Sequence, residues 1–511
     1  MSDNSLNNKR IAKNTAFLYV RMIFVLGVSL YTTRVVLNVL GVEDYGIYNV
    51  VAGFVSMFAF LNSAMINTTQ RFYNYEKSSS EGNALTIVYN TALQIQVLLA
   101  ILLLILLETV GLWFVNNQMI IPVERLAAAN WVFQCSGLSL VLLVLQIPYS
   151  AAIISHEKMD YYALVSIIDV FLKLVVVIVL PYVSYDKLAF YGITSVLVSL
   201  MNFLMYFYYA KRYFIEIKFN RVFVKDKFKE MLSFTGWNVF GSFAYMIQGQ
   251  GLNVLINTFF GPVVNAARGV SFQIQGAISG FSENIATAFR PQLVSSYAES
   301  HFDRTRNLMF SMSKFCFVMV CALSIPIAIE LEYILEIWLK SVVPEYTIIF
   351  TVLVLVNMII NSLNMPISQT VLATGIVKSY QLIRSIIVTA TLPLAWIVLK
   401  TGASPVSVFV ITILISILNQ PVSMIILRKN FTYSYRDYFK VVIVPCSLFL
   451  VLNSAIPYLI HTFMEPSFLR FCIVGSISGF MSLILAYMLI LSKAEKSTIV
   501  NLINSKRNVT R

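Results

Sequence analysis

The stretch Arg21–Arg34, RMIFVLGVSLYTTR, places two arginines inside a run that is otherwise apolar from about residue 16 to residue 40. About 20 apolar residues are enough for a helix to cross a bilayer. An arginine at the bilayer centre costs roughly 2.5–3.5 kcal/mol on insertion scales. The two guanidinium groups must therefore either reach water at the membrane surfaces or face a polar interior of the protein.

The composition of the whole chain supports the membrane interpretation of this stretch. Of the 511 residues, 58% are hydrophobic and 12% are charged, whereas about a quarter of the residues of a soluble protein are charged. The five cysteines lie in apolar runs and the three histidines are far apart, so we expect neither disulfides nor a metal site. The sequence predicts an all-α integral membrane protein with many spans.

Apolar runs separated by polar turns predict 14 transmembrane helices. Their boundaries are 14–38, 45–67, 85–115, 127–154, 162–184, 188–210, 232–259, 263–289, 308–330, 346–373, 379–400, 405–427, 440–460 and 468–491.

The distribution of Lys and Arg predicts the orientation of these helices. With the N-terminus in the cytoplasm, 26 of the 37 Lys and Arg residues fall on the cytoplasmic side and five fall on the opposite side. Cytoplasmic loops carry such an excess of positive charge, so both termini are predicted to be cytoplasmic. The net charge of +13 then reflects topology and attraction to anionic membrane lipids, and we expect no nucleic-acid partner.

The chain contains a weak internal repeat with an offset of about 220 residues. Thr68–Arg71 (TTQR) closes the second predicted span, and Thr287–Arg290 (TAFR) closes the eighth. Two similar six-helix bundles around a central cavity are a transporter architecture. We predict four segments, which are an N-terminal six-helix bundle (1–210), a basic cytoplasmic linker (211–231), a C-terminal six-helix bundle (232–430), and two extra transmembrane helices with a cytoplasmic tail (431–511).

Two stretches of the sequence resemble a known family. Thr33–Asn62 (TRVVLNVLGVEDYGIYNVVAGFVSMFAFLN) and Leu372–Tyr380 (LATGIVKSY) are similar to the polysaccharide transporters, including O-antigen (Wzx-type) flippases, of the multidrug/oligosaccharidyl-lipid/polysaccharide (MOP) exporter superfamily. The resemblance implies two six-helix bundles in a V-shaped, MATE-like arrangement that alternate between inward-open and outward-open states. It also implies a lipid-linked oligosaccharide on undecaprenyl pyrophosphate as cargo, the cytoplasmic membrane of a bacterium as location, and the polysaccharide polymerase machinery as a further partner.

Such a cargo requires a wet, cationic cavity, because a sugar and a diphosphate must cross about 30 Å of hydrocarbon. The planar fork of arginine can make paired hydrogen bonds to phosphate oxygens. Six basic residues within the predicted spans are candidates for this cavity: Arg21, Arg34, Lys173, Arg268, Lys314 and Arg384.

Arg21 and Arg34 lie on different faces of the first span. Arg21 is roughly 10 Å into the helix and either snorkels to the surface or faces the cavity. Arg34 is close to the far end, where snorkelling is favoured. Because thirteen positions correspond to about 220° around a helix, the two side chains do not share a face. Both remain candidate substrate-binding residues, with Arg21 preferred.

Asp169 and Lys173 are four residues apart and share one face of the fifth span. One interpretation is an internal ion pair that offsets its own cost of burial. The other assigns Lys173 to the phosphate and makes Asp169 the candidate for coupling to H⁺ or Na⁺. A carboxylate beside a lysine normally stays ionised, which weakens the proton version.

Arg268, Gln275, Ser279 and Ser282 form a polar stripe on the eighth span, whose other positions are largely apolar. We predict that this stripe is a cavity wall, with Arg268 and Gln275 as substrate-binding residues.

The remaining basic residues lie near the predicted cytoplasmic ends of their spans. Lys314 and Arg384 are expected to snorkel to the head groups. Arg71 and Arg290 are candidates for a cytoplasmic gate; the alternative is that they only anchor helix ends.

The basic residues in the spans favour a flippase over two alternatives. A cation-coupled multidrug (MATE-like) exporter would prefer buried carboxylates, and the spans hold few candidates: Asp169, Glu108 and Glu283. A membrane polymerase or ligase would need a large external loop, whereas the outer loops have about fifteen residues or fewer. We expect no enzyme activity and no cofactor. Because no P-loop motif (GxxxxGK[ST]) occurs, transport would be downhill or coupled to H⁺ or Na⁺.

Overall fold

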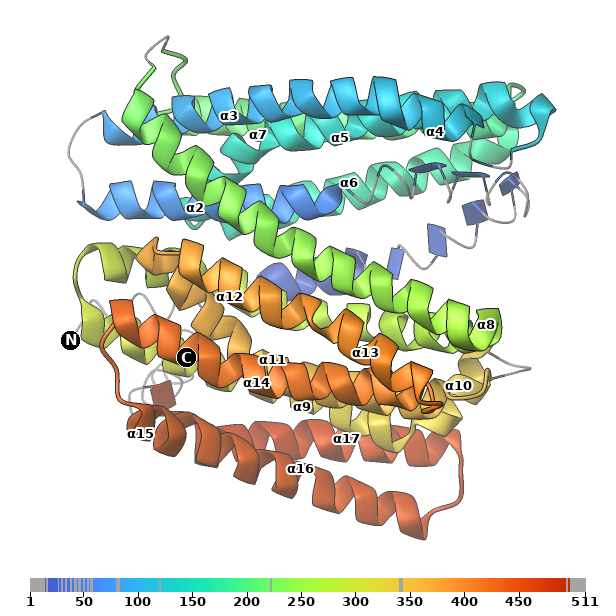
Figure 1. Cartoon of the computed structure of the whole chain (residues 1–511), viewed down its shortest axis with the longest axis vertical. Helices are drawn as coiled ribbons and strands as arrows, with labels where there is room; N and C mark the ends of the chain where they lie inside the picture. Colours follow the sequence, from blue (N-terminus) through green and yellow to red (C-terminus); the bar gives the residue numbers. More distant parts are fainter. Residues whose placement is uncertain are drawn as a thin grey trace, which may run out of the picture. The chain divides into compact units, whose positions relative to one another are not determined.

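The computed structural model is helical, and no strand occurs among the residues that it describes (Figure 1). The described residues are 14, 17–25, 27–28, 31–32, 35–36, 39–40, 44, 47–48, 51–52, 55, 58–79, 83–117, 119, 121–220, 223–339, 343–492 and 495–496.

Within the described part of the chain, ten helices are long and apolar enough to cross a membrane. They coincide with the predicted runs three to six and nine to fourteen. The first two runs lie partly outside the described residues, and the seventh and eighth are joined in one helix. The predicted all-α, multi-pass membrane fold is confirmed, whereas the total of 14 spans and their orientation stay predictions.

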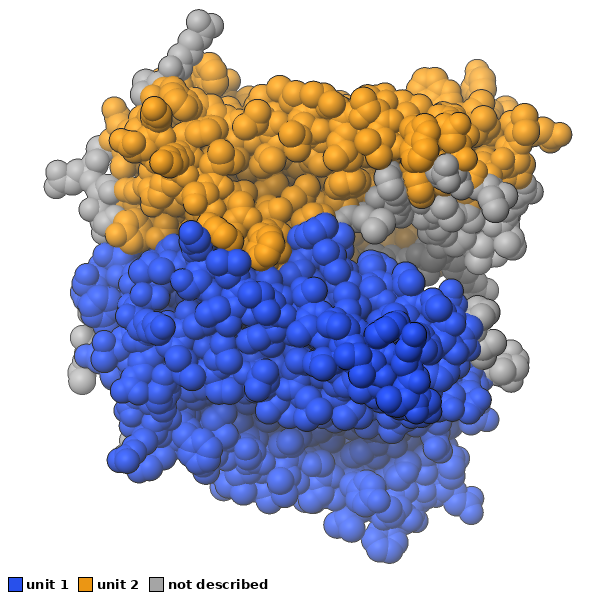
Figure 2. Space-filling view, in the orientation of Figure 1, with its two compact units in different colours: residues 1–15, 243–511 blue, residues 16–242 orange. Residues whose placement is uncertain are grey.

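The chain divides into two compact units (Figure 2). Unit 2 is Ala16–Ser242, and unit 1 is Phe243–Arg511 together with Met1–Thr15. The segment 211–231 lies in unit 2, and the two C-terminal helices lie in unit 1.

Unit 2 is built around α5 (Leu126–Ser155), which contacts α2, α3, α6 and α7. In the most apolar part of the α5 span 67% of the residues are buried, against 17% for the α7 span. α7 packs against α5 at Gly192, where an added Cβ atom would lie 3.4 Å from the Cα of Val132, in ordinary van der Waals contact. The other helices of unit 2 are α2 (Ala59–Ser79), α3 (Ala84–Leu106) with its continuation α4 (Leu112–Asn117), α6 (Met159–Val179) and α7 (Lys187–Tyr213).

Unit 1 contains the helices of the second predicted bundle and the two extra helices. Its central helix is α11, which contacts α9 and α14. The bounds are α9 (Phe302–Ile329), α10 (Leu331–Leu339), α11 (Thr347–Thr374), α12 (Lys378–Thr389), α13 (Thr391–Lys400), α14 (Val406–Asn430), α15 (Tyr435–Tyr438), α16 (Val444–Phe463) and α17 (Phe468–Leu485).

The helix α8 (Lys225–Ala298) combines the seventh and eighth predicted spans. Its helical geometry breaks at Gly261, where φ is 79° and ψ is −177°. Residues with a side chain rarely adopt this φ, so the glycine allows the break between the two halves. The two predicted spans on either side of residue 261 are therefore two helices that meet at Gly261 without a loop between them; α8 denotes both, and we call them its two arms.

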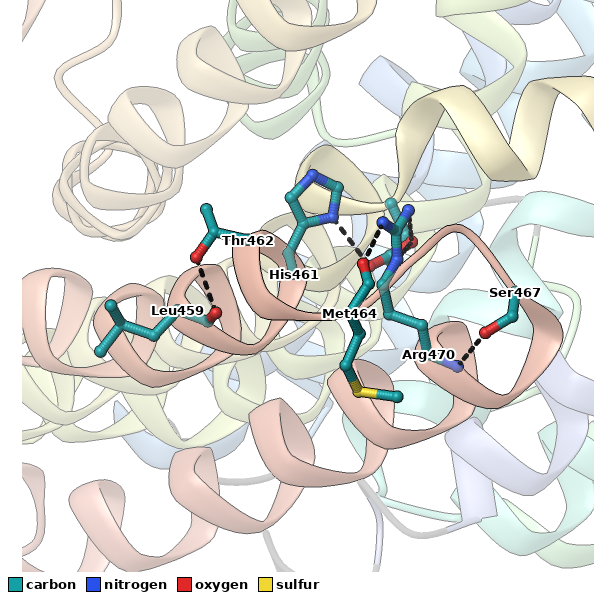
Figure 3. Close-up of polar contacts among 7 residues, drawn as sticks. Leu459, His461, Thr462, Met464, Ser467 and Arg470 are labelled. Carbon is teal, nitrogen blue, oxygen red and sulfur yellow. Dashed lines mark hydrogen bonds and ion pairs between the residues drawn. The ribbon is translucent and has the colours of Figure 1, made fainter.

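An ion-pair cluster attaches α16 and α17 to the end of α9 (Figure 3). Glu330, the residue that follows α9, has a side chain with 0% exposure. One carboxylate oxygen accepts hydrogen bonds from Nε (3.1 Å) and Nη2 (2.9 Å) of Arg470 in α17. The other lies 3.0 Å from Nδ1 of His461 in α16. Ser467 caps α17 by accepting the backbone N–H of Arg470.

A second polar contact joins α9 to the end of the last span. Lys314 is buried, and its Nζ donates to the carbonyl of Ile490 at 2.7 Å. The expectation that Lys314 snorkels to the head groups was wrong, because a carbonyl within the protein satisfies the ammonium instead. Contacts at two places along α9 therefore hold α16 and α17 as part of unit 1.

We expect Glu330→Gln to lower the free energy of unfolding by about 3–5 kcal/mol, because it leaves the buried Arg470 guanidinium without its counter-charge. Thermal unfolding of the detergent-solubilised protein measures this loss. The control is Glu332→Gln, which removes an exposed carboxylate of α10 two residues away. Equal stability of the two variants would contradict a structural role for the cluster.

Candidate functional site

In unit 2, Arg21 is held against tyrosines. Its Cζ lies 4.9 Å from the ring centroid of Tyr162 in α6. Among the described residues, its buried Nε has no hydrogen-bond partner. Tyr206 of α7, which is buried beside Tyr162, is within electrostatic range of Arg21. No ion pair in the described part of the chain involves Arg21. The contacts that the structure gives this guanidinium are therefore with aromatic rings.

Asp169 and Lys173 lie on the same helix as Tyr162. The Lys173 Nζ donates to Oδ2 of Asp169 at 2.8 Å, and Asn202 of α7 donates to the other oxygen at 2.5 Å. The side chain of Lys173 is 57% exposed, against 20% for Asp169. Both oxygens of Asp169 are therefore engaged, while most of the lysine surface is open. A role of Asp169 in ion coupling stays a prediction.

In unit 1, Arg268 joins the two arms of α8. Its Nη2 donates to the carbonyl of Gly249 at 2.9 Å, and its Nη1 donates to Asn253 at 3.2 Å. The guanidinium also lies 4.2 Å from the ring centroid of Phe272. These partners are neutral, and Arg268 forms no ion pair with the residues that the structure describes.

The predicted stripe beyond Arg268 contains polar atoms without partners. Oε1 of Gln275 and Oγ of Ser282 are buried and have no hydrogen-bond partner among the described residues. The hydroxyl of Ser279 donates to the backbone carbonyl of Gly276. Buried polar groups are normally satisfied by protein, water or ligand. The Gln275 amide oxygen is therefore available to a water molecule or a hydroxyl group.

Arg384 of α12 packs against two tyrosines. Its Cζ lies 4.8 Å from the ring centroid of Tyr245 in α8 and 5.4 Å from that of Tyr380. Its Nε is buried and has no hydrogen-bond partner in the described part of the chain. Tyr245 in turn interacts with Asn419 of α14. The distance of Arg384 from the helix end did not indicate these tyrosines, and snorkelling of this side chain stays a prediction.

The two gate candidates are buried, each in its own unit. Arg71 of α2 contacts the rings of Phe72, Tyr75 and Phe234 at 4.7–5.1 Å. Arg290 of α8 donates its Nε–H to Gln369 of α11 at 3.1 Å. Their role as a gate stays a prediction.

Arg34, the last predicted substrate-binding residue, lies outside the described residues.

An ion-pair cluster that the sequence did not suggest lies at the predicted outer end of unit 2. Arg125 bonds to both oxygens of Asp44, at 2.7 and 2.5 Å, and to Asp186 at 2.6 Å. Asp186 also caps α7 by accepting the backbone N–H of Ala189 at 2.9 Å. Burial opposes ionisation of Asp186, but the N–H of Ala189 and the Arg125 guanidinium outweigh it and lower the pKa of this carboxyl.

The lowered pKa of Asp186 predicts an acid-sensitive contribution to stability. A carboxyl with a depressed pKa in the folded state stabilises the fold above its unfolded pKa of about 3.9 and loses that contribution as the pH falls further. We expect the melting temperature to drop between pH 4 and pH 3 in the wild type and to drop less in Asp186→Asn. Glu124→Gln, which changes an exposed neighbour, is the control. An Asp186→Asn profile parallel to that of the wild type would contradict the assignment.

Several solved structures are similar to the chain. A crystal structure of a MATE mutant has a TM-score of 0.72 at 13% identity, and the match covers 82% of this chain and 96% of that chain. An outward-facing multidrug resistance MATE transporter of the MOP superfamily has a TM-score of 0.70 at 14% identity, with 82% and 95% covered. A MOP superfamily transporter from Pyrococcus furiosus, described as having a binding pocket of reverse polarity that suggests a different function, has a TM-score of 0.68 at 14% identity, with 82% and 95% covered.

No family model matches the chain, and no curated protein sequence matches it either. At identities of 13–14%, the likeness to the solved structures shows the fold alone. The chain has the fold of the MATE transporters of the MOP superfamily.

Proposed function

We propose that the protein is a flippase that moves a lipid-linked oligosaccharide, carried on undecaprenyl pyrophosphate, across the cytoplasmic membrane of a bacterium for surface polysaccharide synthesis. Transport would occur by alternation between inward-open and outward-open states, without covalent chemistry. The likeness to MATE transporters supports this mode of action. Membrane lipids and the polysaccharide polymerase machinery are the further proposed partners.

The observation that carries the proposal is the lack of counter-charge at three intramembrane arginines. Arg21, Arg268 and Arg384 contact rings, amides or carbonyls, and none forms an ion pair among the described residues. Charged residues inside a membrane pair with one another or with backbone carbonyls, face the protein interior or a water-filled cavity, and mark substrate pathways. An arginine fork can make two parallel hydrogen bonds to a phosphate group. Unneutralised guanidinium groups therefore suit a diphosphate-bearing cargo.

A cation-coupled multidrug exporter is the alternative with support from the structure. The similar structures include a multidrug resistance transporter. Glu283 of α8 is exposed and makes no ion pair among the described residues, so this carboxylate could take up a cation. The MOP transporter with a pocket of reverse polarity is a precedent for different pocket charge on the same fold. The excess of unpaired arginines over unpaired carboxylates favours the flippase.

Deletion of the gene tests the cargo. We expect the lipid-linked oligosaccharide to accumulate on the cytoplasmic leaflet and the surface glycan to disappear, with both defects corrected by the wild-type gene. Cleavage by an externally added glycosidase shows how much of the oligosaccharide has reached the outer leaflet. An unchanged surface glycan, together with increased sensitivity to cationic drugs, would favour the exporter instead.

Arg21→Ala and Arg268→Ala should each reduce complementation of that deletion at least tenfold at normal protein levels. Lysine should rescue only in part, because an ammonium is a point charge that cannot make the paired contacts. Surface glycan, normalised to the amount of transporter in the membrane, is the measurement. The matched control is Lys211→Ala, which removes an exposed cation at the end of α7. Full activity of either arginine variant would remove that residue from the site.

A further inference from the structure

We infer that Arg384, with Tyr245 and Tyr380, forms a second oxyanion site in unit 1, the counterpart of the Arg21 site in unit 2, and that its ligand is the diphosphate of the cargo. The inference rests on the proposed function for the identity of the ligand. It gives Arg384, one of the three arginines without a counter-charge, a specific partner in the cargo, and it assigns one site built of arginine and tyrosine to each unit.

The first observation is the surroundings of Arg384. Its guanidinium lies between one buried ring, Tyr380, and one ring that is 39% exposed, Tyr245. Arg384 itself is partly exposed, and its buried Nε–H has no acceptor among the residues that the structure describes. A buried donor without a partner is costly. The site is therefore closed by the Tyr380 ring, open at the Tyr245 ring, and has the Nε–H of Arg384 as a hydrogen-bond donor for a ligand. A ligand with oxygen acceptors would suit it.

The second observation is that both units contain the same pair of residue types between equivalent helices. In unit 2, Arg21 of the first predicted span contacts Tyr162 of the fifth. In unit 1, Tyr245 of the seventh contacts Arg384 of the eleventh. Tyr245 lies 224 positions after Arg21, and Arg384 lies 222 positions after Tyr162. These offsets are five and three positions longer than the 219 positions between Arg71 and Arg290 of the internal repeat, a difference of about one helical turn.

The two pairs are therefore related by the repeat, with arginine and tyrosine exchanged between the helices. The distances from guanidinium carbon to ring centroid are alike, at 4.9 Å and 4.8 Å. A buried tyrosine accompanies each pair, Tyr206 in unit 2 and Tyr380 in unit 1. The exchange changes which helix carries the charge, but it leaves one guanidinium between the same two helices of each unit.

The depth of the two arginines agrees with a diphosphate ligand. Arg21 lies seven residues, roughly 10 Å, and Arg384 lies five residues, roughly 8 Å, from the predicted cytoplasmic start of its span. A prenyl diphosphate in the inner leaflet holds its phosphates near the head groups. An anionic phospholipid presents a similar oxyanion at the same depth, so the experiment must separate the two sources.

Binding of farnesyl diphosphate to the full chain in nanodiscs of phosphatidylcholine tests the site. The measurements use an Arg21→Gln background, so that the unit 2 site does not contribute. We expect the Arg21→Gln variant still to bind farnesyl diphosphate. Adding Arg384→Gln to this variant should weaken the binding at least tenfold. Farnesol, which lacks the diphosphate, should not bind. The matched control, Lys400→Gln, removes an exposed cation from the other end of the same span and should leave the affinity unchanged.

A reciprocal exchange tests the equivalence of the two units. Arg384→Tyr should abolish binding, and the double variant Tyr245→Arg/Arg384→Tyr, which reproduces the order of unit 2, should restore it. Thermal unfolding of each variant confirms that it is folded. If Arg384→Gln proves unfolded, the double variant decides: restored binding supports the site, and absent binding at wild-type stability overturns it.

Two further outcomes would overturn the inference. One is unchanged affinity after Arg384→Gln, and the other is complete loss of binding in Arg21→Gln alone. Displacement of the probe by phosphatidylglycerol at equal mole fraction would assign the oxyanion to a head group and overturn the cargo as its source. Failure of the proposed function would be seen in a different experiment. The surface glycan would then be normal after deletion of the gene, while Arg384→Gln would still weaken binding of farnesyl diphosphate.

Discussion

A guanidinium inside a membrane span must be satisfied without water, and this constraint governs the interior of both units. A carboxylate partner would satisfy the guanidinium best but would also neutralise its charge. Aromatic rings offer another solution, because a cation over a ring gains about 0.5–2 kcal/mol and remains charged. Arg21 and Arg384 both use tyrosine rings in this way, and Arg268 uses a phenylalanine ring with neutral acceptors. The interior thereby keeps positive charge that an anion can use.

The carboxylates of the protein serve a different purpose from these arginines. Asp44 and Asp186 bind Arg125 at one end of unit 2, and Glu330 binds Arg470 where three helices of unit 1 meet. These neutralised clusters join segments that are distant in the sequence. Where a carboxylate is present, the arginine holds helices together; where it is absent, the arginine keeps its charge. This division separates the structural cations of the fold from those that we assign to transport.

The apolar runs were sufficient to predict most helices, because a bilayer imposes both the length and the composition of a span. They could not show that the seventh and eighth helices meet directly at Gly261, since only the backbone conformation distinguishes such a kink from a loop. The site was harder to predict. Lys314 and Arg384 were both assigned to the head groups from their distance to a helix end, which did not indicate the carbonyl and the tyrosines that these side chains contact. Nothing in the sequence distinguishes the tyrosines around the arginines from the other tyrosines among the 27 of the chain.

The exchange of arginine and tyrosine between the repeats bears on why these residues are present. A merely structural contact could be replaced in one repeat by any pair of apolar side chains, at a gain in stability. Each unit instead keeps one arginine and one tyrosine at corresponding positions, although the order along the chain is reversed. The attraction between a cation and a ring does not depend on which helix supplies which partner. What the two units share is therefore one guanidinium against a tyrosine ring between corresponding helices. A charge that costs free energy to bury needs a compensating partner, and the anionic cargo that we propose would supply it.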